Sequence, residues 1–225
     1  GSYSSCSATP YTCTNRYYID FVSGNNSTGT GARGTPWKTL EMVCNYTSGA
    51  PSGHVNLVAG DCVFLMGSGT VNYTTTYAHN GYPTPANTFC WLSQSGSSGS
   101  PIKIAEEPGT DYVFDPATDA SFYIDGSDNW VTFNAFTGGY TTAIHAYGTR
   151  TKLSNIYCHD NILGNGDSNV TCFKVDAQSV DIFNNRIADI YGASGSTENQ
   201  DLITLFSSTK NVEIVNNVLY YTQAI

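Results

Sequence analysis

The second half of the chain repeats a short, alternating strand pattern, and this repeat limits the possible folds more than any other feature. Four stretches align, namely VTFNAF, IYCHDNIL, VDIFNNRI and VEIVNNVL, which begin at Val131, Ile156, Val180 and Val212. Their starting points are 25, 24 and 32 residues apart. Apolar and polar residues alternate in each, which is the period of a β-strand with one buried face. Repeats of this length indicate a solenoid, in which each unit packs only on its neighbours.

A second strand precedes each of these stretches. The corresponding segments are FYID, AIHA, CFKV and LITLF, which begin at Phe122, Ala143, Cys172 and Leu202. No helical pattern separates the strands, whereas parallel sheets made of βαβ units need helical crossovers. The repeat therefore predicts an all-β parallel β-helix with rungs of about 25 residues.

Three of the repeats carry a polar pair at the end of a strand. These pairs are Asp160-Asn161, Asn184-Asn185 and Asn216-Asn217. Asparagine suits turns, and stacked asparagine amides can bond from rung to rung. A buried amide without a partner costs about 1–3 kcal/mol, so a repeated asparagine indicates that each copy meets the next. We therefore expect a structural ladder of Asn161, Asn185 and Asn217.

The segment from Arg16 to Leu40, RYYIDFVSGNNSTGTGARGTPWKTL, differs from the repeats. An aromatic strand is followed by a glycine-rich loop and then by Thr35 and Pro36, which suit the start of a helix. Such a short amphipathic helix would cover the exposed strand edges at the end of the solenoid. Its apolar face would contain Trp37, Leu40, Val43 and Cys44.

Three motifs in this order resemble the right-handed parallel β-helix superfamily, the pectate-lyase-like proteins. The first is YYIDFVSGNNSTGTGARGTPWKTL, and the others are VAGDCVFLMGSG (Val58–Gly69) and GSPIKIAEEPG (Gly99–Gly109). The resemblance implies a right-handed β-helix with a short N-terminal capping helix. Residues 1–15 are expected to form a Cys-containing tail. Residues 16–225 are expected to form a single domain, with the cap at 16–57 and the rungs at 58–225.

Charge limits the partners that the chain can bind. Only 12% of the residues are charged, about half the usual share, and the net charge is −9. The nine Lys and Arg form no basic run, which argues against a nucleic-acid partner. An anionic polymer would be repelled unless a metal ion or a local cationic pocket intervened.

Cysteines and sequons indicate an extracellular protein. The seven cysteines have no zinc-site spacing and are expected to form disulfides, with one cysteine left over. No signal peptide and no apolar run of membrane-spanning length is seen, so we expect a mature secreted product. Five sequons predict N-linked glycans at Asn25, Asn26, Asn45, Asn72 and Asn169.

Resemblance to the β-helix lyases also implies a set of catalytic candidates. Such enzymes use Lys or Arg to remove the proton next to a carboxylate, and Ca²⁺ or a second cation neutralises that carboxylate. Lys174 and Arg186 are the candidate bases, and Asp160, Asp167 and Asp176 are candidate calcium ligands. Lys174 and Asp176 also fit an ordinary solvated pair. The paired carboxylate signatures of β-helix glycoside hydrolases are missing.

Two functions are therefore compatible with the sequence. One is a structural β-helix glycoprotein, which needs no cofactor and stacks head-to-tail with copies of itself into extracellular filaments. The stretch NVEIVNNVLYYTQAI supports this reading, because no capping segment follows its strand. The other is a polysaccharide lyase acting on acidic glycans by β-elimination with Ca²⁺, as a fragment of a longer enzyme. The sixteen Tyr suit carbohydrate stacking and protein interfaces alike.

Overall fold

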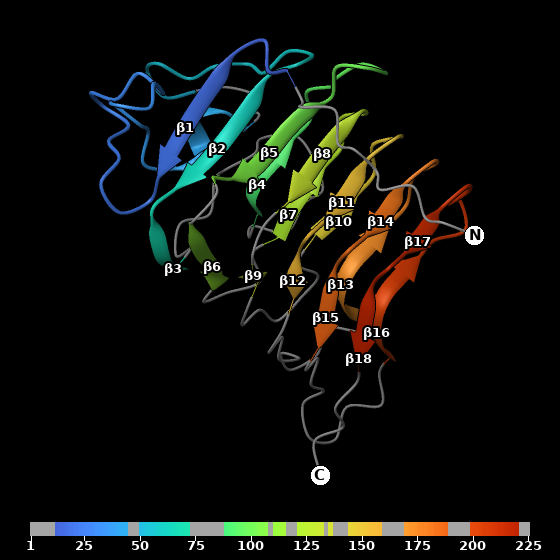
Figure 1. Ribbon diagram of the computed structural model, residues 1–225. Coiled ribbons are helices and arrows are strands. Elements are labelled where there is room, and N and C mark those ends of the chain that lie inside the picture. The colour runs from blue at the N-terminus through green and yellow to red at the C-terminus, as the bar shows by residue number, and fades with distance from the viewer. Residues whose placement is uncertain are drawn as a thin grey trace, which may run out of the picture.

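The structure is a computed structural model of the 225-residue chain. It describes residues 12–44, 50–72, 88–107, 110–115, 121–132, 135–136, 144–158, 169–188 and 199–220. The described strands form three sheets in which every strand pair is parallel (Figure 1). The chain visits the three sheets in turn on each rung, which is a parallel β-helix. The predicted right-handed β-helix fold is therefore confirmed.

Sheet A, the largest, has seven strands. Its order is β1 (Arg16–Asp20), β2 (Cys62–Met66), β5 (Ile102–Glu106), β8 (Asn129–Thr132), β11 (Lys152–Ser154), β14 (Asp181–Phe183) and β17 (Glu213–Val215).

Sheet B has six strands and follows sheet A along each rung. Its order is β3 (Ser68–Asn72), β6 (Asp111–Asp115), β9 (Ala135–Phe136), β12 (Tyr157–Cys158), β15 (Arg186–Ala188) and β18 (Val218–Tyr220).

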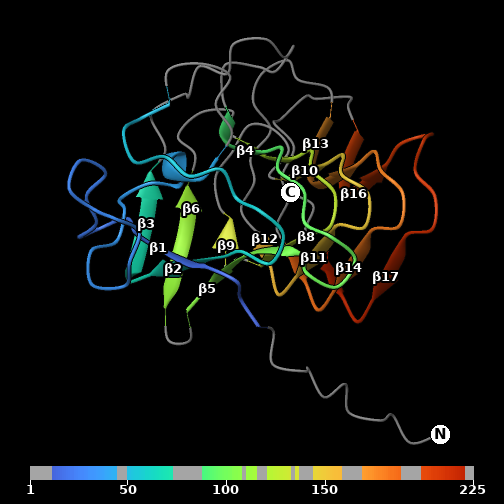
Figure 2. The ribbon, with the colours of Figure 1, turned by 90° about the horizontal axis from the view of Figure 1, so that it is seen from above.

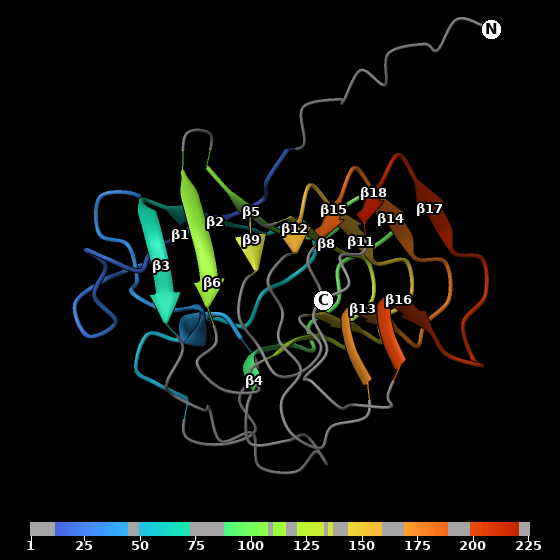
Figure 3. The same ribbon diagram turned by 90° about the horizontal axis from the view of Figure 1, so that it is seen from below.

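Sheet C has five strands and completes each rung. Its order is β4 (Thr88–Leu92), β7 (Ser121–Ile124), β10 (Ile144–Ala146), β13 (Asn169–Val175) and β16 (Asn199–Leu205). Sheets A and C form separate layers, seen from above in Figure 2 and from below in Figure 3.

The core lies between the three sheets and is built from rows of aligned apolar residues. On sheet A, Ile104, Val131, Leu153 and Ile182 follow one another in register, and all four are fully buried. Burying a side chain of this size contributes about 1.5–3 kcal/mol. Because the alternate residues face outward, the same register that builds the core also builds rows of polar and aromatic residues on the outer faces.

The corner between sheets A and B contains a shorter asparagine ladder than expected. Asn185 is buried, and its Nδ2 donates to Oδ1 of Asn217 at 3.0 Å. On the preceding rung the register pairs Tyr157 with Arg186, so Ile156 rather than Asn161 occupies the position of Asn185. The expected alignment of Asn161 is therefore wrong, and Asn161 itself lies outside the described residues.

The physical reason for this difference is the conformation of the corner. The same corner position is occupied by Asn155, Asn184 and Asn216 on three rungs. Their φ angles are positive, at 54°, 57° and 54°. Asparagine tolerates this left-handed conformation better than most residues. On the rung that precedes Asn184, the residue at the same position is therefore Asn155. It lies five residues before Asp160, which the sequence alignment had placed there.

The expected capping helix is also wrong. The only helix among the described residues is a 3₁₀ turn at Leu40–Met42. Trp37 is extended and forms a parallel bridge with Ile19 of β1, so hydrogen bonding to the sheet edge replaces the expected helix there. The burial prediction nevertheless agrees with the structure, because Trp37, Leu40, Val43 and Cys44 are at most 1% exposed.

Three disulfides join the described cysteines. Cys13 pairs with Cys62, Cys44 with Cys90, and Cys158 with Cys172. The third bridge links β12 of sheet B to β13 of sheet C. The remaining cysteine, Cys6, lies outside the described residues. Among the described residues, no helix has the length and apolar character that a membrane crossing requires.

Candidate active site

A row of side chains runs across the outer face of sheet C. The register aligns Trp91, Tyr123, His145, Lys174 and Thr204 on five consecutive strands. Their chain neighbours Phe122, Ile144 and Phe173 are buried in the core. Because side chains alternate along a strand, the row faces away from the interior.

His145 stacks on one aromatic ring of this row and lies near a second ring, that of Tyr147. Its ring centroid lies 4.3 Å from that of Tyr123, and the two rings are 16° from parallel. The Tyr147 ring follows at 6.0 Å, and His145 Nδ1 is 3.3 Å from the Tyr147 hydroxyl oxygen. These contacts hold the imidazole beside Lys174 of the next strand.

Burial sets the protonation of two members of the row. Desolvation, helped by the nearby positive charge of Lys174, lowers the pKa of His145 to about 3. Desolvation, with a smaller contribution from Tyr147, raises the pKa of Tyr123 to about 12. At neutral pH His145 is therefore uncharged, and Tyr123 keeps its proton as a hydrogen-bond donor.

Lys174 is half-buried, and its charged end contacts an aromatic ring rather than an acid. The Nζ atom lies 4.7 Å from the ring centroid of Phe206. Within the part of the chain that the structure describes, Lys174 forms no salt bridge with a carboxylate. Asp176 lies just beyond β13, where its backbone N–H donates to the Ala146 carbonyl oxygen. An amine beside an uncharged imidazole is suited to bind an anionic sugar when it carries a proton, and to remove a proton when it is uncharged.

The other predicted catalytic residues do not join this row. Arg186 lies on sheet B, with its guanidinium carbon 4.6 Å from the ring centroid of Tyr157. Asp160 and Asp167, the other expected calcium ligands besides Asp176, lie outside the described residues. The described residues contain no group of three His, Cys, Asp or Glu that could hold a metal ion.

Two adjacent sequons differ in their local structure. Asn25 is exposed, whereas the Asn26 amide donates to Thr39 Oγ1 at 2.7 Å and its oxygen accepts from the Lys38 N–H. Asn72 ends β3 and Asn169 begins β13. Asn45 lies outside the described residues.

Sequence reasoning missed Tyr123, His145 and Tyr147. A usable signal was present, because FYID, AIHA and CFKV align so that Tyr123, His145 and Lys174 share one outward position. The packing of His145 against two tyrosine rings has no sequence signature, since it depends on the direction in which each ring turns.

The three parallel sheets, the alternating core rows and the stacked corners define a right-handed parallel β-helix. Among solved structures, a rhamnogalacturonan lyase is similar to this chain, with a TM-score of 0.62 at 17% sequence identity. The match covers 90% of this chain and 56% of the lyase. At this identity the similarity shows the fold alone.

A GH136 lacto-N-biosidase from Eubacterium ramulus is a more distant match, with a TM-score of 0.34 at 13% identity, over 87% of this chain and 41% of that chain. No protein-family model matches the sequence. No curated protein matches it either.

Proposed function

We propose that this protein is a polysaccharide lyase that cleaves an acidic glycan by β-elimination on the outer face of sheet C. The observation that carries the proposal is the position of Lys174, which is aligned with the uncharged His145 and has no carboxylate partner among the described residues. The shared fold with a rhamnogalacturonan lyase supports it. The three disulfides fit an extracellular site of action.

Lys174 acts as the base in this proposal. In its uncharged form, Nζ takes the proton from the carbon next to the uronate carboxylate. The electron pair left behind forms a carbon–carbon double bond as the bond to the glycosidic oxygen breaks, and that oxygen then takes a proton from a donor such as water. The half-buried Tyr147 can contact a sugar ring, and the buried Tyr123 and His145 pack beside it without adding a competing charge.

The substrate carboxylate must be neutralised for this proton to leave. A bound Ca²⁺ would supply that charge stabilisation. Asp125 and Asp176 both lie at strand ends on sheet C, but the described residues provide no three-ligand cluster. Proton removal is therefore assigned to Lys174 and its neighbours alone. The dependence of the cleavage rate on Ca²⁺ is measured in the test.

The test is product formation. The chain is incubated with rhamnogalacturonan, polygalacturonate, alginate and chondroitin, with added Ca²⁺ or with a chelator, and the absorbance of the unsaturated uronate is recorded. We expect cleavage of at least one polymer, with a rate that rises with pH because only an uncharged amine acts as base. Lys174→Ala is expected to lower the rate at least a hundredfold, the usual contribution of general-base catalysis.

Lys38→Ala is the matched control, because Lys38 is an exposed lysine of the N-terminal cap. The wild-type rate is expected in this variant. No unsaturated product from any polymer, or equal rates in the wild type and Lys174→Ala, would contradict the proposal. Loss of activity in Arg186→Ala but not in Lys174→Ala would move the site to sheet B.

A second candidate function is head-to-tail stacking of a secreted, glycosylated β-helix into filaments. It is favoured by Ile214 and Leu219 of the β17–β18 rung, which are aligned with the fully buried Ile182 and Ile187 yet are 43% and 46% exposed. An apolar rung with exposed strand edges can pair with another copy of the chain.

Electron microscopy and light scattering of the purified chain test this second proposal. Filaments that dissociate in Leu219→Asp would support it. The control is Val22→Asp, because Val22 is an exposed apolar residue at 67% that lies away from this rung. Monomeric particles at all concentrations would rule it out.

A further inference from the structure

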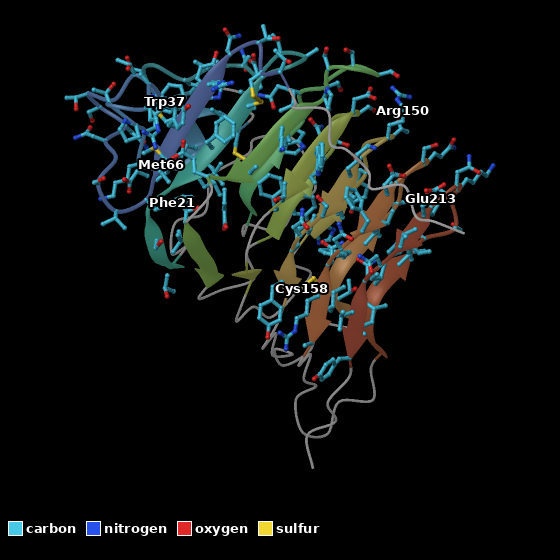
Figure 4. All side chains as sticks on the ribbon, viewed as in Figure 1. Phe21, Trp37, Met66, Arg150, Cys158 and Glu213 are labelled. Atoms are coloured by element: carbon cyan, nitrogen blue, oxygen red, sulfur yellow. A yellow bond between two sulfur atoms is a disulfide. The ribbon has the colours of Figure 1, made fainter. Side chains whose placement is uncertain are left out.

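A pocket lies at the corner where each rung enters sheet A, on a different face of the solenoid from the Lys174 row. Its volume is about 460 Å³, within the range of small-ligand sites. The pocket is lined by residues 97–99 together with Pro101, Asp128, Trp130, Arg150, Lys152, Ser179 and Asp181. In Figure 4, Arg150 is labelled near the beginnings of β8 and β11, two central strands of sheet A.

The corner that carries this pocket is tightly stacked. Asp128, Arg150 and Ser179 occupy the same corner position on three rungs, with positive φ values of 54°, 55° and 58°. Gly126 and Gly148 precede the first two, and a Cβ on either would collide with a backbone carbonyl oxygen of the rung below. The pocket therefore stands on a closely packed backbone, which favours preorganised binding.

Two ion pairs cross the pocket from rung to rung. Arg150 donates from Nε and Nη2 to the two carboxylate oxygens of Asp128, at 2.8 and 2.6 Å. The Asp128 side chain is 8% exposed, whereas that of Arg150 is 55% exposed. Lys152 Nζ lies 3.0 Å from Asp181 Oδ2. Both pairs place a hydrogen-bond donor next to an acceptor at the pocket surface.

Trp130 supplies an aromatic wall with a defined orientation. Its Nε1 donates to Ser154 Oγ at 2.7 Å, and its ring packs against Phe183 at a centroid distance of 6.2 Å. Lys103 Nζ lies 4.5 Å from the indole centroid. With Arg150 and Lys152, this lysine places three of the nine basic residues of an acidic chain around one tryptophan.

We propose that this pocket binds a pyranose segment of a polysaccharide, at a site on sheet A that is separate from the Lys174 row on sheet C. Neighbouring sugar hydroxyls both donate and accept hydrogen bonds, which matches the paired donors and acceptors of the two ion pairs. The apolar face of a pyranose matches the indole of Trp130. The inference goes beyond the proposed lyase activity and does not depend on it.

The first experiment follows the indole N–H signals of the ¹⁵N-labelled chain by NMR. Oligosaccharides from polygalacturonan, rhamnogalacturonan and uncharged galactan are titrated into the Lys174→Ala variant, in which cleavage cannot remove the ligand. We expect a saturable shift of the Trp130 signal, assigned with Trp130→Phe, and no shift of buried Trp37. Binding of galactan would show recognition of hydroxyls, and binding of uronates alone would show recognition of a carboxylate; either supports the site.

The second experiment compares two arginines. Arg150→Ala is expected to weaken binding at least tenfold. Arg33→Ala is the matched control, because Arg33 is also an exposed arginine with a bidentate carboxylate partner, Glu107, outside the pocket. The proposal is overturned if no saccharide shifts Trp130, or if the two variants bind equally well. A Trp130 shift without lyase activity would contradict the proposed function only, and lyase activity without that shift would contradict this site only.

Discussion

Replacing Asn185 with alanine removes the buried side chain of the asparagine ladder. Asn185 is 2% exposed. Its Oδ1 accepts from the Ile156 N–H at 2.9 Å, and its Nδ2 donates to the Leu153 carbonyl oxygen at 3.0 Å as well as to Asn217. The substitution therefore leaves two backbone groups of the rung below without these partners, at a corner that is buried.

The expected loss follows from those two groups. A buried polar group that loses its partner costs about 1–3 kcal/mol, so Asn185→Ala should lower the free energy of unfolding by about 2–6 kcal/mol. For a domain of this size each kcal/mol shifts the melting temperature by about 2–4 °C. We therefore expect a decrease of at least about 4 °C.

Thermal and urea unfolding of the oxidised protein, followed by circular dichroism, measure this loss. Asn184→Gly is the matched control, because Asn184 is an exposed neighbour with a φ of 57° that glycine adopts freely. Its free energy of unfolding should change by less than about 1 kcal/mol. If Asn185→Ala matched this control, the ladder would not stabilise the solenoid.

Three further predictions concern other parts of the chain. The pKa of His145 is about 3 in the folded state, so between about pH 6.5 and 3 the unfolded chain binds more protons than the folded chain. The free energy of unfolding should therefore fall as the pH decreases through this range. Urea unfolding at several pH values should show a flatter dependence for His145→Phe. Replacing Cys158 and Cys172 together with alanine should lower the free energy of unfolding by about 3 kcal/mol, measured by thermal unfolding, because their bridge closes a short loop of 14 residues. In a eukaryotic host, glycopeptide mapping should find sugar on Asn25 and not on Asn26, whose amide already bonds Thr39; the reverse occupancy would contradict this contrast.

The core rows and the corner residues differ in how far the local sequence pattern predicts them. Period-two alternation was enough to place Ile182 and Ile214 in one inward row, because a strand side chain has only two directions available. It put Val131 level with Val180, whereas the register brings Val131 level with Leu153 and Ile182. The same pattern could not align the rung that contains Ile156, since rung lengths vary with the loops between strands. Asn155 was the correct corner residue, and its left-handed backbone became visible only in the structure.

The N-terminal cap shows the same division. Its apolar residues were readable, yet the choice between a helix and an extended segment was decided by the free edge of β1, which pairs with Trp37. The edge of a sheet offers unpaired backbone N–H and C=O groups to hydrogen-bond with, whereas a short isolated helix forms few hydrogen bonds of its own.

The sequence by itself determined that the chain builds a solenoid of short parallel strands with an apolar interior, because strand period, turn residues and repeat length are local properties. Only the tertiary structure decided which outward residues meet. Lys174 joins His145 on sheet C, Arg186 stands apart on sheet B, and Trp130 joins Arg150 on sheet A. Residues tens of positions apart become neighbours at the strand spacing of about 4.8 Å, so the composition of each outer face depends on register, which no single segment specifies.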